Sequence, residues 1–360
     1  MHSRCLDEAM INEANKDRGR LKGYMWEAIV MRLLQENDFV EITAIDNLRI
    51  KRERGYFVEM RGRGTWHQID CPCEYTHFIP FVNPLRLLGE VKFYRNPVQK
   101  NLIREFIGTI KDIQENYFVS DDFTQPSARY TELGAYFSAN GFDPEAERLA
   151  FAHNIKTISH KNVEPLEGLK IQIEDLERNY LFVGNCISAN NQQDFIRLFR
   201  EILAGDVPSI GMFIERFQPA DGFRQVALDL AASFEKIGSN FVASSSGGAL
   251  LHFIGTEHFP DELFTNTDTQ FCRVFFEMTP TGRRFHLVFT ADNEQRRFFF
   301  SPPVSLAQAA FFGATEALNE KERIFRTLHI SRSIRGLART LVLRLDQDWL
   351  EGVRRVHDHQ

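Results

Sequence analysis

The sequence has few cysteines and no long apolar run, and both features narrow the possible classes of protein. Its five cysteines are scattered and odd in number, which favours reduced thiols in a cytoplasmic protein over a disulfide framework. Cys71 and Cys73 are separated by one residue, and no second pair accompanies them to form a zinc site. No run approaches the roughly 18 apolar residues of a membrane span, and residues 1–20 lack the apolar core of a signal peptide. We therefore expect a cytoplasmic protein with no membrane partner.

Several common catalytic motifs are also absent. The sequence has no G-x-x-x-x-G-K-[ST] loop, no G-x-G-x-x-G opening a helix, no H-E-x-x-H and no G-x-S-x-G. Its net charge of −6 argues against a protein coated in positive charge. That charge is still compatible with nucleic acid, because an enzyme that must release its polymer can confine basic residues to one groove.

Length and hydrophobic patterning predict two domains. The chain of 360 residues exceeds one typical core, and its hydrophobic and charged fractions of 43% and 26% are those of a globular protein. In the first half, the periodicities follow the order α-β-β-β-α-β-α-β, which predicts an α/β fold with a mixed sheet flanked by helices. We expect helices at 21–37, 98–117 and 144–154, and strands at 39–44, 66–78, 85–94, 128–141 and 155–159.

The second half reads as a separate α+β domain that we cannot assign to a family. We expect a helical extension over 1–17, the first domain over 18–165 and the second over 166–360. Phe-rich strands in the second domain could stack bases of single-stranded nucleic acid, but such strands more often fill a core. The patterning predicts helices near 194–203, 223–237 and 306–328, and strands at 208–217, 270–278, 284–292 and 340–345.

Two charged residues stand on a strand that is otherwise apolar. Glu90 and Lys92 fall on one face of the strand predicted at 85–94, about 6.7 Å apart, while Val91 and Phe93 face the core. Charged side chains on a buried strand are costly unless they are paired or used. The pair is therefore a candidate for function.

A carboxylate on the preceding strand can meet this pair. Asp70 shares a strand face with Gln68, and if the two strands pair as a hairpin, Asp70 and Glu90 converge on one cation. Two carboxylate oxygens, the backbone carbonyl of Val91 and waters suit octahedral Mg²⁺. The metal would polarise a phosphodiester, and Lys92 would hold the attacking water or the developing charge. The alternative is a surface hairpin whose charged side chains form weak ion pairs in solvent.

The segments around these residues resemble the Mrr-type restriction-endonuclease family of the PD-(D/E)xK superfamily. The resemblance covers residues 23–159 and rests on GYMWEAIVMRLLQENDFVEI, GRGTWHQID, LLGEVKFYRNPVQKNLIREFIGTIKD and LGAYFSANGFDPEAERLAFAHNIKTIS. The family pairs a strand ending in H-Q-I-D with a strand ending in E-x-K, and a valine starts the next helix, as Val98 does here. This sequence departs from the pattern at Val91, where the family more often has cysteine or a similar small residue.

The resemblance implies a restriction-endonuclease-like fold and a metal-dependent endonuclease that hydrolyses DNA phosphodiester bonds. It implies Mg²⁺ as the cofactor, for which Mn²⁺ could substitute, and restriction or defence against foreign DNA as the setting. It gives catalytic roles to Asp70, Glu90 and Lys92, with the metal on both carboxylates and on the backbone of Val91. Since cutting both strands needs two active sites, we expect a homodimer.

Neighbouring residues are open to more than one interpretation. Glu27 matches a glutamate of the family's opening helix that often joins the metal site, although a single Glu on an amphipathic helix is usually solvated. Gln68 could orient Lys92 or a water through its amide. His67 points to the opposite strand face and is more typical of a packed histidine than of a general base. Gly62 and Gly64 could form a phosphate nest or allow a tight turn before the strand.

Basic and aromatic residues near the motif are candidates for contact with DNA. Tyr94, Arg95 and Lys100 lie where the E-x-K strand passes into its helix, and Arg61 and Arg63 flank the two glycines. These five side chains could contact backbone phosphates, or they could form solvated caps. Both interpretations stay open.

Two other functions compete with a restriction nuclease. One is a catalytically idle nuclease fold that serves as a binding or scaffold protein, and the intact set of Asp70, Glu90 and Lys92 counts against it. The other is a DNA repair or junction nuclease. In either nuclease, we expect the second domain to choose the target or to regulate cleavage, which is an argument from analogy.

Overall fold

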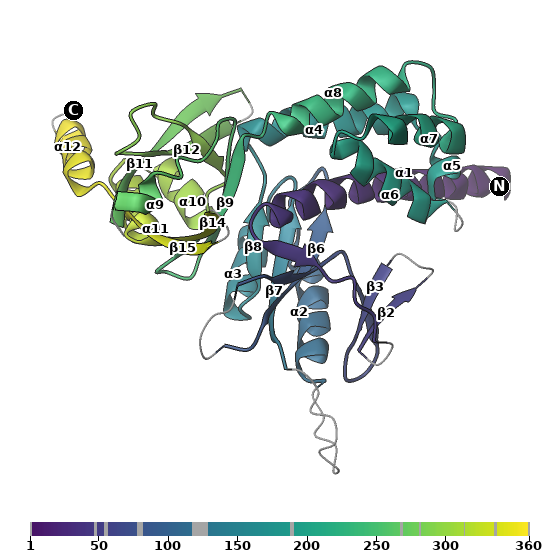
Figure 1. Cartoon of the computed structure of the whole chain (residues 1–360), viewed down its shortest axis with the longest axis horizontal. Helices are drawn as coiled ribbons and strands as arrows, with labels where there is room; N and C mark the ends of the chain where they lie inside the picture. Colours follow the sequence, from purple (N-terminus) through teal and green to yellow (C-terminus); the bar gives the residue numbers. More distant parts are fainter. Residues whose placement is uncertain are drawn as a thin grey trace, which may run out of the picture.

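The structure is a computed structural model that describes residues 2–46, 49–53, 57–77, 82–116, 129–187, 191–266, 269–280, 282–312, 314–334 and 337–358. Over these residues the chain is a mixed α/β protein with a mixed sheet flanked by helices, a layer of helices and a closed β-barrel (Figure 1). The two ends of the chain lie far apart, the N-terminus beyond the helical layer and the C-terminus beside the barrel. No described helix is long and apolar enough to cross a membrane.

A five-stranded mixed sheet organises the first half of the chain. Its elements are α1 (His2–Gln35), β1 (Phe39–Glu41), β5 (Cys71–Tyr75), β6 (Leu85–Lys92), α2 (Lys100–Gln114), β7 (Thr131–Ser138), α3 (Pro144–Ala152) and β8 (Lys156–Ser159). The strand order is β1-β5-β6-β7-β8, with β6, β7 and β8 parallel and the β1–β5 and β5–β6 pairs antiparallel. The helices expected over 21–159 are present, and so are the strands apart from the one expected at 66–78, which is divided.

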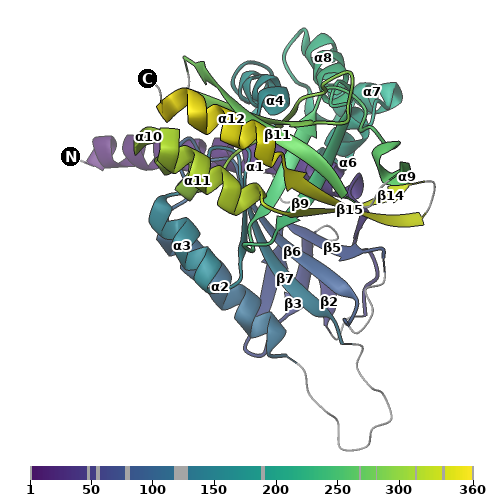
Figure 2. The same cartoon turned by 90° about the vertical axis from the view of Figure 1, so that its left-hand side faces the viewer.

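Alternation along β6 explains why helices cover both faces of this sheet. Leu87 and Val91 are buried in a core shared with α1, whereas Leu88 is buried in a second core shared with α2 and α3. Helix α2 buries Ile103, Phe106, Ile110 and Ile113, which recur every three to four residues along one face. Figure 2 shows α2 and α3 on the same side of the sheet, to the left of β7.

A small three-stranded sheet lies beside the main one. It consists of β2 (Ile50–Glu53), β3 (Phe57–Arg61) and β4 (Trp66–Ile69), in that order. The single strand expected at 66–78 is therefore two strands, because the chain leaves the small sheet after Ile69 and enters the main sheet at Cys71. Asp70 is the residue between the two sheets.

A layer of helices follows the sheet and packs on α1. It consists of α4 (Glu164–Asp175), the π-helical turn η1 (Leu176–Tyr180), α5 (Val183–Ile187), α6 (Gln192–Leu203), α7 (Val207–Phe217) and α8 (Phe223–Glu235). Their buried residues belong to the same hydrophobic core as α1 and the inner residues of β5, β6 and β7. The boundary that we expected at residue 165 coincides with the start of α4, inside this core.

The prediction of a strand at 208–217 is wrong, because this segment belongs to helix α7 (Val207–Phe217). The Asp206 side chain accepts a hydrogen bond from the Ser209 backbone N–H at 3.2 Å and caps the helix. Ile210, Phe213 and Phe217 then recur at helical spacing and are buried. The density of β-branched and aromatic residues suggested a strand, but the cap and the spacing favour a helix.

The rest of the chain forms a closed barrel and its helices. The described strands of the barrel follow the order β10-β13-β12-β11-β15-β14-β9. Phe285, Phe289 and Phe298 are buried inside it, which confirms the expected core, whereas Phe271 and Phe276 stay 49% and 40% exposed. The helix expected at 306–328 corresponds to α10 and α11, and residue 313 between them lies outside the described residues. The elements are β9 (Ser239–Ser245), β10 (Leu250–Gly255), α9 (Leu263–Asn266), β11 (Thr269–Thr279), β12 (Gly282–Phe289), β13 (Phe298–Phe300), α10 (Val304–Phe312), α11 (Ala314–Phe325), β14 (Leu328–Ile334), β15 (Leu337–Leu345) and α12 (Gln347–Asp358).

Candidate active site

The carboxylates expected to converge do so where β5 pairs with β6. Cys71 lies opposite Gly89 in this antiparallel pair, so Asp70, one residue before Cys71, comes beside Glu90, one residue after Gly89. The register is set by apolar residues that must face the two cores. The hairpin-like pairing expected from the sequence is present.

The Lys92 ammonium lies between the two carboxylates. Its Nζ is 3.1 Å from Asp70 Oδ2 and also forms an ion pair with Glu90 Oε1. The same Asp70 oxygen accepts the Val91 backbone N–H at 3.0 Å. The Asp70 side chain is 10% exposed, and those of Lys92 and Glu90 are 22% and 23% exposed. The cluster is thus shielded on most sides but still reaches solvent.

The backbone carbonyl of Val91 points to the edge of β6 that carries Asp70. The carbonyl of Lys92 accepts the Ala139 backbone N–H at 3.0 Å, on the β7 side. Successive backbone groups of a strand point to opposite edges, so the Val91 carbonyl points away from β7. The Val91 N–H, which donates to Asp70, lies on this same edge.

Glu27 on α1 is electrostatically coupled to the cluster. Burial, followed by repulsion from Asp70, raises the pKa of Glu27 well above its usual value, and the same two causes raise the pKa of Glu90 to about 7. Burial alone would lower the pKa of Lys92, but attraction by Asp70 and Glu90 raises it. Asp70 and Glu90 therefore pair with one ammonium, and the raised pKa values of Glu90 and Glu27 mean that the site resists carrying three ionised carboxylates together.

The donor set fits a hard divalent cation. Asp70, Glu90 and the Val91 carbonyl supply oxygen ligands from one edge of the sheet, and waters can complete an octahedral shell. Over the described ranges, no three His, Cys, Asp or Glu side chains form a complete metal-binding group. The Lys92 ammonium partly neutralises the two carboxylates, and a bound cation would relieve the remaining repulsion.

Gln68 and His67 do not join this cluster. Gln68 is exposed on β4, opposite Glu59 in the small sheet, and its side chain makes no hydrogen bond to the cluster in the described part of the chain. His67 Nε2 lies 2.7 Å from Asp112 Oδ2 on α2. This contact with Asp112 agrees with the interpretation of His67 as a packed histidine and not a general base.

The glycine loop before β4 holds a carboxylate of the protein itself. The Gly64 backbone N–H donates to both oxygens of Asp112, at 3.0 and 3.2 Å, and the Thr65 N–H donates at 3.4 Å. A Cβ atom on Gly62 would lie 2.0 Å from Asp112 Oδ2. Asp112 thus fills the nest considered for phosphate, and Gly62 is needed for this close approach.

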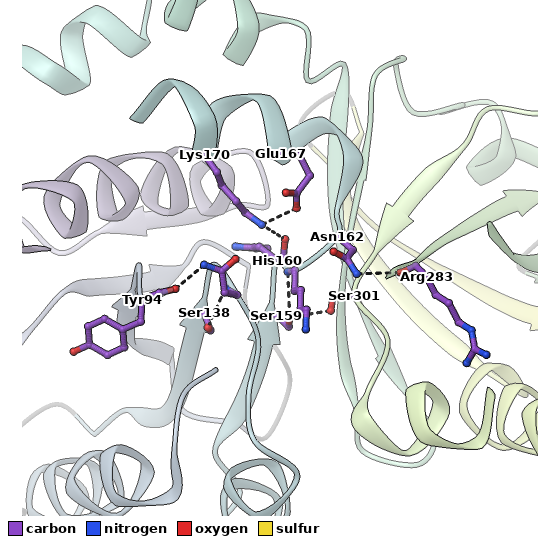
Figure 3. A network of polar contacts seen from close by, with 11 residues as sticks. Tyr94, Ser138, Ser159, His160, Asn162, Glu167, Lys170, Arg283 and Ser301 are labelled. Carbon is purple, nitrogen blue, oxygen red and sulfur yellow. Dashed lines mark hydrogen bonds and ion pairs between the residues drawn. The ribbon is translucent and has the colours of Figure 1, made fainter. Parts of the chain in front are cut away.

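The five candidates for contact with DNA lie on exposed surface. Lys100 pairs with Glu145 at 2.6 Å and Arg63 pairs with Glu115 at 3.2 Å. Tyr94 is 44% exposed, and its backbone carbonyl accepts the Asn140 side-chain amide at 2.6 Å (Figure 3). Tyr94 and Arg95 follow Lys92 closely along the chain, whereas Arg61 and Arg63 belong to the β3–β4 hairpin. Both Arg61 and Arg95 are exposed.

Two further residues act on the site and were missed from the sequence. Arg200 on α6 pairs with Glu41 at 2.8 Å, and its charge opposes the rise in the pKa of Glu27. Tyr136 on β7 is aligned with Glu90 and fully buried. No local signal identifies Arg200, since its place depends on how α6 packs against α1. The Tyr136 position follows from strand alignment, which only the sheet order reveals.

Comparisons with known proteins supply no family. No family model matches the chain, and no curated protein matches it. Among solved structures, it is similar to a crystal structure of a protein of unknown function, AF1548, with 17% identity over 59% of this chain and 97% of that one, and a TM-score of 0.33. A similarity at this TM-score supports no argument about fold or function.

Proposed function

We propose that this protein is a metal-dependent endonuclease that hydrolyses phosphodiester bonds in DNA, through a restriction-endonuclease-like domain over 18–165. The observation that carries the proposal is the convergence of Asp70 and Glu90 on Lys92 at one sheet edge, with Glu27 electrostatically coupled to the two carboxylates. Such an unbalanced, partly exposed cluster is costly for folding and typical of a catalytic site. The resemblance to the Mrr-type family points to the same chemistry.

In this proposal, separate residues bind the metal, the attacking water and the DNA backbone. Asp70, Glu90 and the Val91 carbonyl would hold Mg²⁺ or Mn²⁺. The bound metal would polarise the scissile phosphate and lower the pKa of the attacking water. Lys92, held by both carboxylates, would orient that water and stabilise the charge that develops on the phosphate. Arg95 and Tyr94, directly after the E-x-K strand, would contact the DNA backbone.

Plasmid cleavage tests this proposal. Purified wild-type protein and Asp70→Ala would be incubated with supercoiled plasmid in Mg²⁺, in Mn²⁺ and in chelator. We expect metal-dependent nicking or linearisation by the wild type. The rate of cleavage should fall by at least about 100-fold in the variant. Cleavage that persists unchanged in Asp70→Ala would refute the assignment.

The rival functions give different results in the same assay. An idle nuclease fold would show no cleavage and no stabilisation by Mg²⁺ or Mn²⁺. A repair or junction nuclease would prefer nicked or branched DNA over linear DNA. Sedimentation of the protein with and without DNA would test the homodimer that double-strand cleavage requires.

A further inference from the structure

A cleft lies between the main sheet and the barrel, away from the candidate active site. One lobe, of about 320 Å³, is lined by α3, β8, the turn between β9 and β10, and residues 301–303. A second lobe, of about 350 Å³, is lined by α3, the same turn, and residues of α10 and α11. Glu147, Phe151, Ala249 and Pro303 line both lobes. The two lobes therefore form one cleft with a shared wall.

That shared wall carries an acceptor and an aromatic ring. Glu147 Oε2 accepts the Val304 backbone N–H at 2.9 Å, and no described residue donates to its other oxygen. Burial raises the pKa of Glu147 to about 7, so the carboxylate would gain from further N–H donors. Phe151 follows one turn later on α3 and is 69% exposed. An open ring beside a half-buried carboxylate suits a flat heterocycle that carries N–H groups.

Three basic side chains also line the cleft. Arg148 and Arg323 line the second lobe and Lys156 lines the first, while Glu147 is the one carboxylate among the lining residues. Arg323 is already paired with Glu320 at 2.8 Å and donates to Ser305 Oγ at 3.2 Å. The second lobe therefore presents cationic groups of the kind that bind phosphate.

We propose that this cleft binds a guanine nucleotide, with the N–H edge of the base on Glu147, its ring against Phe151 and its phosphate near Arg148 and Arg323. Guanine is favoured because its neighbouring N1–H and N2–H groups match a carboxylate, whereas the corresponding edge of adenine presents a donor and an acceptor. The nucleotide could be free or part of a DNA strand, since both sources present the same base and phosphate.

The position of the cleft links it to both halves of the chain. Thr157 and Ser159 line its first lobe, and the sheet aligns them through β7 with Glu90 and Lys92 respectively. Two strand spacings separate each pair, or about 10 Å. Ser301 of the barrel side donates to Ser159 Oγ at 2.8 Å (Figure 3). A ligand here would contact the sheet that carries the candidate active site and the barrel together.

Calorimetric titration of the full chain in chelator tests the proposal without relying on cleavage. The ligands are GMP, IMP, which lacks the 2-amino group, AMP, and a short single-stranded oligonucleotide with one guanine or with hypoxanthine in its place. We expect guanine to bind at least about tenfold more tightly than hypoxanthine or adenine, as a charge-assisted pair of N–H bonds would give. Binding of GMP would identify a free nucleotide, and guanine-dependent binding of the oligonucleotide alone would identify a strand.

Variants locate the site. Glu147→Gln keeps an acceptor for Val304, and we expect it to reduce the preference for guanine by at least about tenfold. Phe151→Ala should weaken the binding of every base by about tenfold, because stacking on the ring is lost. Glu235→Gln, at an exposed carboxylate of α8 outside the cleft, is the matched control and should bind like the wild type. Absence of guanine-dependent binding, or binding that Glu147→Gln and Phe151→Ala leave unchanged, would overturn the proposal.

Discussion

Two clusters of polar groups within the fold differ in their balance of charge. In the candidate active site, three carboxylates are coupled to one ammonium. The other cluster, here called the histidine network, consists of His160, His252, Asn240, Asn37 and Glu36. His160 Nε2 lies 3.1 Å from His252 Nδ1, and His252 Nε2 lies 2.9 Å from Asn240 Oδ1. Asn240 then contacts Asn37 and donates to Glu36 Oε2 at 2.6 Å.

The histidine network joins parts of the chain that are distant in sequence. His160 follows β8, His252 lies on β10, Asn240 lies on β9 and Asn37 follows α1. Burial lowers the pKa values of both histidines, so these side chains are neutral at pH 7. Glu36, at the end of the network, is exposed, and the other members are neutral groups that hydrogen-bond one another and can be buried at modest cost. The network therefore holds the barrel to the sheet, whereas the crowded carboxylates of the other cluster repel one another and suit a cationic ligand.

The largest difference between the clusters should appear in Glu90→Gln. This change keeps the size of the side chain but removes one of the coupled carboxylates. We expect plasmid cleavage to fall by at least about 100-fold. The free energy of unfolding in chelator should rise or fall by no more than about 0.5 kcal/mol, because the repulsion from Asp70 and the ion pair with Lys92 are lost together. Cleavage rates and urea denaturation would measure the two effects.

A matched control distinguishes the loss of a metal ligand from the loss of a nearby negative charge. Glu105→Gln removes a nearby exposed carboxylate of α2, and we expect cleavage within about twofold of the wild type, as for most surface substitutions. Stabilisation by added Mg²⁺ should persist in Glu105→Gln and disappear in Glu90→Gln. A Glu90→Gln protein that is destabilised but cleaves normally would make Glu90 a structural residue.

In the histidine network, we expect a substitution to lower the stability of the fold and to leave the binding of metal unchanged. His252→Ala leaves His160 Nε2 without its partner, removes one of the hydrogen bonds of Asn240 and opens a cavity, so we expect a loss of about 3 kcal/mol in the free energy of unfolding. Urea denaturation would measure it, with His258→Ala as the exposed control. Stabilisation by Mg²⁺ should remain, since the metal ligands are unchanged. A loss below about 0.5 kcal/mol would mean that the network does not hold the barrel in place.

The active-site cluster was predictable because its determinants are local. Alternation of Leu87, Leu88 and Val91 fixes which residues of β6 face the two cores, and this places Glu90 and Lys92 on one face. Pairing with the preceding strand then brings Asp70 to Glu90. Both steps depend only on the alternation of side chains along a strand and on the short connection between two neighbouring strands.

Other features depend on tertiary packing, and local patterns could not reveal them. Alternation put Gln68 beside Asp70, but the chain changes sheets between them, so Gln68 faces solvent. The composition of 208–217 resembled a strand although the segment is a helix. The place of Arg200 follows from how helices of the second half pack on α1, and that packing has no short sequence signal.

The smallest expected effect is a difference in pH dependence, and it tests whether the network is neutral. An unfolded histidine binds a proton near pH 6.5, whereas burial lowers the pKa of His252 to about 4 in the folded protein. Between these values the unfolded state holds more protons, so the free energy of unfolding falls as the pH falls. His160, which contacts His252, and Lys170, which donates to the His160 backbone carbonyl at 2.7 Å, also have lowered pKa values.

His252→Gln isolates this contribution, because the amide can hydrogen-bond but does not titrate. Between pH 6.5 and 4, we expect the free energy of unfolding to depend on pH less steeply in the variant, by about 1 kcal/mol per pH unit. Glu90, whose pKa is raised, contributes with the opposite sign, but it does so in both proteins and cancels in the difference. Parallel curves from urea denaturation across this range would show that His252 is already protonated in the folded protein. The two clusters would then no longer differ in kind, since both would bury charge.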